Sequence, residues 1–396
     1  MGACPLTATD RTTGCTMRSA MRNIAAVLLS VFSAVRAQAQ SAELHGQASG
    51  WLMAHPADPA SAQSGLRYIP DLLAAAPLSG SLNADLELSL NAFTDAAVAA
   101  DRHPATASDV KAYRAWLRLA TDRFEARIGL QKINFGSALL FRPLMWFDRV
   151  DPRDPLQLTD GVTGLLLRYT FQDNANIWTW MLYGNAGTKG WELSPTRQRT
   201  VEYGGRIQST IGPGEAAITY HHRRADLRNL GLMFAGRSDV PEDRIGLDGK
   251  WDLGIGVWFE TALTRTDIDI PELRYQRLAT LGADYTFGIG DGLYVAAEYF
   301  RADRPSGPLA HAARTDFSGL LMTYPLSILD QLSAMIYRDW TNRHWYRIAT
   351  WQRNYDNWSV YLLGFWNPDA APGPQAQTVN AAFAGAGAQL TLVFNH

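Results

Sequence analysis

Alternation of apolar and polar residues with a period of two is the feature that most restricts how this 396-residue chain can fold. In the segment 81–91, every even position holds leucine or alanine and every odd position holds a polar residue. The segments 123–131 and 200–210 alternate in the same way. Successive side chains of a β-strand point to opposite faces, so these segments suit strands with an apolar solvent on one face and water on the other. A soluble β-sandwich would alternate in the same way, so alternation alone does not decide the fold.

The lengths of the connections favour a transmembrane barrel over a sandwich. Short turns are expected at 77–80, 121–122, 172–174, 212–214, 252, 288–292, 325–327 and 354–357. Longer polar segments alternate with them, at 54–64, 95–108, 133–161, 185–199, 222–242, 265–275, 302–313 and 367–380. Only the connection at 339–342 is short where a long one is expected. Short turns at one end and long loops at the other are typical of outer-membrane barrels. The count predicts an all-β, antiparallel up-and-down barrel of 18 strands, or of 16 if Pro70 breaks the strand at 67–76.

The N-terminus has the features of an export signal. Basic residues occur at 17–22, an apolar stretch covers 24–35, and Ala37-Gln38-Ala39 fits the rule for cleavage between small residues. We therefore expect a signal peptide at 1–39, in which 1–16 is an over-extended gene start, and a single barrel domain at 40–396. Cys4 and Cys15 both precede the expected cleavage site, so the mature chain would hold no disulfide or cysteine metal ligand.

Composition agrees with a membrane barrel. Aromatic residues make up 11% of the chain and charged residues only 19%, below the roughly 25% of soluble domains. No apolar run reaches the ~18–20 residues that a membrane helix needs. The net charge of −2 gives no basic footprint for nucleic acid, and no cofactor-binding or metal-binding motif appears.

Aromatic side chains fall near the ends of the expected strands, where rings would form two girdles at the lipid–water interface. Examples are Tyr169, Phe171, Tyr285 and Phe287. The segment 384–394 resembles the closing strand of bacterial outer-membrane proteins, which ends in phenylalanine and is read by the barrel-assembly machinery. Here two further residues follow that phenylalanine, which departs from the family pattern.

The segment 127–136 leads into the longest loop. It reads Arg-Ile-Gly-Leu-Gln-Lys-Ile-Asn-Phe-Gly and resembles the strand that precedes the third loop in the porin superfamily. The resemblance implies a bacterial outer-membrane channel, exported through the periplasm, for passive diffusion of small hydrophilic solutes. It implies no enzymatic activity, contact with membrane lipid and lipopolysaccharide, and a homotrimer as one expected assembly. It also implies that loop 133–161 folds into the pore and narrows it.

The charges of that loop and of the polar strand faces suggest how a pore would select. The candidate constriction residues are Arg142, Asp148, Arg149, Asp151, Arg153, Asp154 and Asp160. The candidate residues of the lumen wall are Arg114, Arg118, Arg123, Arg127, Arg168, Arg206 and Arg244. Charge that lines a pore biases which ions pass, so this set predicts a mild preference for anions. The alternative is that the arginines pair with Glu125, Glu202 and Asp248 and only stabilise the wall.

Three other functions remain open at this stage. A barrel can serve as a sleeve around a partner such as a multihaem electron-transfer protein, which needs no constriction. It can carry an enzyme site, although no nucleophile–base motif stands out and the adjacent residues His221 and His222 would point to opposite faces. It can transport apolar compounds, which the polar inner phase disfavours.

Overall fold

We describe the fold from a computed structural model of the chain. The structure describes residues 41–56, 61–99, 102–228, 238–312, 314–368 and 383–396. The expected signal peptide at 1–39 lies outside these residues. No helix in the described ranges is both long and apolar enough to cross a membrane.

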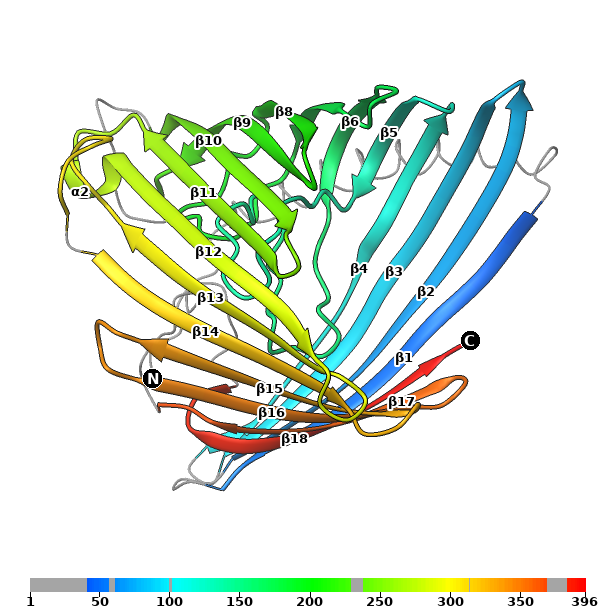
Figure 1. The fold of residues 1–396 in the computed structure, drawn as a ribbon. Coiled ribbons are helices and arrows are strands. Elements are labelled where there is room, and N and C mark those ends of the chain that lie inside the picture. Colours follow the sequence, from blue (N-terminus) through cyan, green and yellow to red (C-terminus); the bar gives the residue numbers. More distant parts are fainter. Residues whose placement is uncertain (1–40, 57–60, 100–101, 229–237, 313, 369–382) are drawn as a thin grey trace, which may run out of the picture.

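Eighteen antiparallel strands form one closed sheet, because β1 pairs with β18 as well as with β2 (Figure 1). The strand order predicted from the sequence is confirmed, with 18 strands and not 16. The strands are β1 (Ser41–His55), β2 (Ser61–Ser79), β3 (Leu82–Ala99), β4 (Arg102–Ala120), β5 (Phe124–Gln131), β6 (Val162–Thr170), β7 (Asn176–Tyr183), β8 (Val201–Ile211), β9 (Gly214–Asp226), β10 (Asp239–Asp252), β11 (Gly256–Thr266), β12 (Tyr275–Phe287), β13 (Leu293–Asp303), β14 (Arg314–Pro325), β15 (Asp330–Asp339), β16 (Trp345–Asn354), β17 (Trp358–Trp366) and β18 (Ala386–Asn395). A single helical turn, α2 (Pro271–Arg274), lies between β11 and β12.

Pro70 does not break its strand. It lies within the 19-residue β2, opposite Gly46 of β1, and the ladder to β3 resumes at Asp71 after Tyr68. Proline has no N–H to donate, so a local gap in one ladder is the expected cost.

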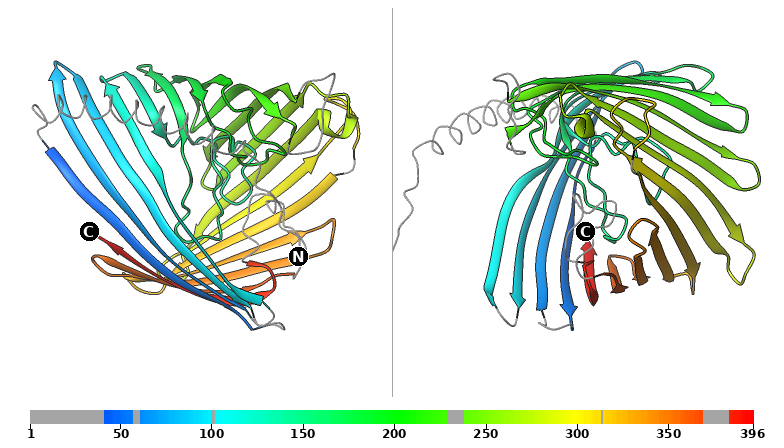
Figure 2. Two further views of the ribbon diagram at one scale, coloured as in Figure 1. Left: turned by 180° about the vertical axis from the view of Figure 1, so that it is seen from behind. Right: turned by 90° about the vertical axis from the view of Figure 1, so that its left-hand side faces the viewer.

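The prediction of a long loop is wrong at two places in the chain. The segments 54–64 and 95–108 belong mostly to strands, because β1 runs to His55, β2 begins at Ser61, β3 runs to Ala99 and β4 begins at Arg102. These long strands extend the wall beyond its neighbours (Figure 2). A strand that rises above the membrane meets water on its outer face, so its sequence need not alternate.

The outward face of the barrel is apolar. Ile207, Ile218 and Leu247 on three successive strands are 56%, 50% and 43% exposed, while the adjacent inward side chains of Arg206, Thr219 and Asp248 are buried. The C-terminus lies at the end with the short turns, since the Asn395 amide donates to the Asn357 carbonyl in the β16–β17 turn. Aromatic pairs also occur at that end: the rings of Tyr169 and Phe171 lie 4.9 Å apart.

Candidate channel lumen

The β5–β6 loop (132–161) lies inside the barrel, where two glutamates of the wall hold its backbone (Figures 1 and 2). Glu298 of β13 accepts hydrogen bonds from the amides of Leu139, Leu140 and Phe141, at 2.6, 3.0 and 2.8 Å. Glu260 of β11 accepts from the Ala138 amide at 2.7 Å. A buried backbone amide without an acceptor is costly, so each of these bonds stabilises the position of the loop. The two carboxylates therefore fix the loop against the β11–β13 wall.

Aromatic packing supports the same placement. The ring of Phe141 stacks on Phe300 of β13 at 5.3 Å and meets Tyr337 of β15 edge-on at 5.4 Å. Gly319 of β14 leaves the space for it, since a Cβ there would approach the Leu140 and Phe141 side chains to 2.7 and 2.9 Å. This apolar anchor excludes water from the hydrogen bonds beside it.

The β7–β8 loop (184–200) also folds inward. Trp191 stacks on Phe300 at 4.9 Å and donates from its indole nitrogen to the Arg142 carbonyl at 2.8 Å. Gly190 has a φ of +42°, and a Cβ at this position would lie 1.7 Å from the Met145 carbonyl oxygen. Glycine is therefore required where the two loops touch. The sequence did not predict this second inward loop.

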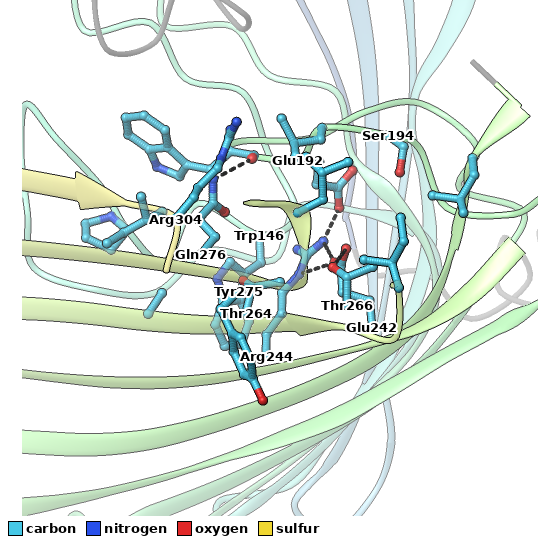
Figure 3. A pocket seen from close by; sticks show the side chains of 18 residues that line it. Trp146, Glu192, Ser194, Glu242, Arg244, Thr264, Thr266, Tyr275, Gln276 and Arg304 are labelled. Atoms are coloured by element: carbon cyan, nitrogen blue, oxygen red, sulfur yellow. Dashed lines mark hydrogen bonds and ion pairs between the residues drawn. The ribbon is translucent and has the colours of Figure 1, made fainter. Parts of the chain in front are cut away.

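Behind these loops lies a buried cluster of oppositely charged side chains (Figure 3). Arg244 of β10 contacts Glu192 of the β7–β8 loop at 2.8 Å and Glu242 of its own strand at 2.6 Å. Arg223 of β9 also contacts Glu242, at 2.6 Å. The cavity beside them measures about 50 Å³, which is enough for ordered water and too little for a solute. The cluster joins the loop to the wall.

A larger cavity of about 400 Å³ lies on the other side of the β5–β6 loop, which we call the β14–β17 cavity. The loop contributes Arg142, Val150, Pro152, Arg153 and Asp154 to its lining, among others. The facing strands contribute Thr323, Ser333, Thr350, Gln352 and Tyr361. Its volume lies within the roughly 300–1,000 Å³ of small-molecule sites.

The predicted constriction residues pair mainly within the loop. Arg142 lies 3.5 Å from Asp148, and Arg153 lies 3.0 Å from Asp151. Burial raises the pKa of the Asp148 carboxyl above its ordinary value, and Arg142 and Lys132 oppose this shift only in part. Burial also raises the pKa of the Asp154 carboxyl.

The two remaining members of that set lie toward water. Asp160 pairs at 2.6 Å with Lys111 of β4 and is largely exposed. Arg149 is exposed as well. Only part of the predicted constriction set, Arg142, Arg153 and Asp154, therefore lines the β14–β17 cavity itself.

The predicted wall arginines divide into two groups. Arg118, Arg127 and Arg168 surround Glu125 at 3.2, 3.0 and 3.9 Å. Arg206 pairs with Asp248 at 2.6 Å, and both are buried. These contacts match the alternative in which arginines stabilise the wall, although Glu202 contacts His221 at 3.4 Å and Lys189 at 3.9 Å instead.

The other group lacks a carboxylate partner among the described contacts. Arg114 donates to the Thr159 carbonyl at 3.1 Å and lies over the Tyr113 ring. Arg123 lies in the exposed turn between β4 and β5. Arg67 of β2, which sequence reasoning missed, lies over the rings of Trp51 and Phe93.

Sequence reasoning also missed Glu260 and Glu298. Both stand on the inward face of strands, yet nothing local distinguishes them from other inward carboxylates. Within the described ranges, no group of three or more histidine, cysteine, aspartate or glutamate residues is arranged to hold a metal ion.

A closed 18-strand antiparallel barrel is the fold of the bacterial outer-membrane porins, as the resemblance predicted. Solved structures of similar fold include OccK5 (OpdH) and OccK7 (OpdD) of Pseudomonas aeruginosa, at 11% and 10% identity and a TM-score of 0.54 each. Each comparison covers 90% of this chain, and 98% and 99% of those chains. OccAB1 of Acinetobacter baumannii gives 9% identity and a TM-score of 0.54, over 90% of this chain and 96% of that one. At these identities the likeness shows the fold. No protein-family model matches the chain, and no curated protein matches it.

Proposed function

We propose that this protein is an outer-membrane channel for passive diffusion of small hydrophilic solutes, without enzymatic activity. One observation carries the proposal: the interior of a barrel with an apolar outer face keeps a cavity of about 400 Å³ beside the inward loop, with polar side chains on both of its sides. Charged, hydroxyl and amide side chains line this cavity, so water can fill it. The β14–β17 cavity is then the narrow part of the pore, and the β5–β6 loop is its constriction.

The proposal includes a mild preference for anions. Arg67 and Arg114 have no salt bridge in the described part of the chain, so no carboxylate in direct contact neutralises their charge, although Arg114 itself is only 7% exposed. Asp71 and Asp95, on the neighbouring inward positions of β2 and β3, each keep a buried oxygen without a hydrogen-bond partner and offset that charge. The preference is therefore expected to be small.

Export and assembly complete the proposal. The chain would lose residues 1–39 on its way through the periplasm and be inserted by the barrel-assembly machinery. It would then contact lipid and lipopolysaccharide, with a homotrimer as the assembly to test by mass measurement in detergent. A sleeve around a partner protein is less well supported, because two inward loops occupy the bore that such a partner would need.

Liposome swelling tests the channel directly. Purified protein in vesicles should admit small sugars, and the swelling rate should fall steeply with solute size. A planar bilayer should show stepwise ion currents, with a reversal potential of small magnitude and anion-selective sign. Vesicles that swell no faster than protein-free vesicles would rule the channel out, and a cation-selective reversal potential would remove the anion preference alone.

A further inference from the structure

The wall that faces the constriction loop carries no charge at the β14–β17 cavity. Its polar lining residues are Thr323 of β14, Ser333 of β15, Thr350 of β16, and Gln352 and Tyr361 of β16 and β17. The arginines and carboxylates of the open lumen lie instead on β2 to β6. From this asymmetry we infer that the cavity is a weak binding site for neutral polyhydroxylated solutes. The inference rests on the proposed channel and names its preferred solute class.

The neutral groups form two neighbouring rows across the strands. In one row Thr323 is the register partner of Ser333, and Ser333 is the partner of Thr350. The hydroxyl oxygens of Thr323 and Ser333 lie 3.4 Å apart. In the next row Gln352 is the partner of Tyr361 and donates to its hydroxyl at 3.4 Å. Cross-strand partners stand side by side on one face, so the rows present a continuous set of donors and acceptors.

Hydroxyl and amide groups suit sugars because both can donate and accept. A polyol that enters the cavity can exchange its hydrogen bonds to water for bonds to these rows. Leu321, Met335 and Pro152 line the same cavity and can cover the C–H surface of such a solute. Wall sites of this kind bind weakly and in series, as conduction requires.

The opposite side of the cavity offers little to a charged solute. Arg142 and Arg153 each contact a carboxylate of the same loop, and Asp154 adds a further negative charge. An anionic solute that sheds its hydration shell here meets no uncompensated positive charge. A cationic solute meets only the Asp154 carboxylate, which already accepts a hydrogen bond from the Leu156 amide. The desolvation of either solute is therefore poorly repaid. Small inorganic ions pass hydrated, so the summed charge of the β2–β6 wall and of the loop sets their preference.

Block of the single-channel ion current by added solute tests the inference. Glucose, glucuronate and glucosamine share one ring and differ in charge, so each is added in turn to the same open channel. We expect glucose to interrupt the current at lower concentration than either charged analogue. Thr350→Val and Gln352→Leu should each weaken glucose block about threefold to tenfold, the factor that one lost hydrogen bond is worth.

Thr179→Val makes the same chemical change on the exposed outer face of β7 and serves as the matched control. Its glucose block should equal that of the wild type. If Thr350→Val fails to form a heat-resistant barrel in a gel assay, Ser333→Ala replaces it.

The outcomes separate the two proposals. Equal or stronger block by glucuronate or glucosamine would overturn the inference, as would unchanged block in both wall variants. Absence of any ion current from the wild-type protein would instead overturn the channel, and the solute class with it.

Discussion

The carboxylate of Glu298 accepts a hydrogen bond at 2.8 Å from the backbone amide of Phe141, a residue 157 positions earlier in the chain. The same carboxylate also receives the indole N–H of Trp258 at 3.0 Å. One side chain of the wall thus fixes residues 139–141 of the inward loop. The width of the proposed pore depends on contacts of this kind, and the following predictions test them.

Replacing Glu298 with alanine should release the loop. Three backbone amides and the Trp258 indole would lose their acceptor, at about 1–3 kcal/mol for each group left buried without a partner. We expect a larger single-channel conductance, admission of larger sugars in liposome swelling, and unfolding at a lower temperature. Glu298→Gln keeps one acceptor oxygen and should give a smaller effect. Glu272→Ala, which removes an exposed carboxylate from α2, is the control. Wild-type conductance in Glu298→Ala would show that the loop does not depend on this anchor.

Replacing Gly319 with valine should displace the same loop by a different route. A Cβ at 319 would lie within 3 Å of the Leu140 and Phe141 side chains, so the loop must move away from β14. That movement should narrow the β14–β17 cavity or displace the Phe141 ring from its stack on Phe300. Either change alters the conductance. Gly364→Val on β17 is the matched control, since its nearest neighbour would lie at 3.4 Å. The prediction fails if both variants conduct like the wild type.

Acidification should strengthen the anion preference. Burial raises the pKa values of Asp148 and Asp154, so both carboxyls take up protons at a higher pH than ordinary aspartates. As the pH falls they lose negative charge while Arg142 and Arg153 stay charged, which leaves the loop more positive. Because the folded-state pKa is the raised one, the protonated carboxyls favour the folded loop below their ordinary pKa. This contribution is lost as the pH rises through the raised value.

Reversal potentials measured over a series of pH values test this prediction. The potential should move in the anion-selective direction as the pH is lowered. At the highest pH of the series, the reversal potential of Asp148→Asn should lie nearer to the value that the wild type reaches at low pH. It should also change less as the pH is lowered. A shift of the reversal potential toward cation selectivity on acidification would contradict the proposed protonation of Asp148 and Asp154.

Arg206 and Arg114 should differ in what they control. Arg206 and Asp248 form a buried pair, and losing one partner of such a pair costs about 3–5 kcal/mol. Arg206→Met should therefore lower the unfolding temperature and leave the reversal potential near that of the wild type. Arg114 has no carboxylate partner among the described contacts, so Arg114→Met should reduce the anion preference and cost less stability. A larger selectivity change in Arg206→Met than in Arg114→Met would contradict this division.

Alternation within the strands and the contrast between short turns and long loops together predicted the barrel. Each strand has apolar side chains on one face and polar side chains on the other, and the connection lengths distinguish a membrane barrel from a soluble sandwich. The same local information gave the 18 strands, the short-turn end and the long third loop. It failed at 54–64 and 95–108, whose described residues belong mostly to strands although polar residues, proline and short alanine runs there suggested loops.

Only the tertiary structure decided which inward arginines form ion pairs and which do not. Arg206 and Arg114 look alike in the sequence, yet Arg206 meets Asp248, which lies 42 residues away on β10, and Arg114 meets a backbone carbonyl. The inward β7–β8 loop, the Glu298 anchor and the uncharged β14–β17 wall likewise depend on segments far apart in the chain. Closure of the barrel brings these groups together, and this arrangement is not encoded in any local stretch of residues.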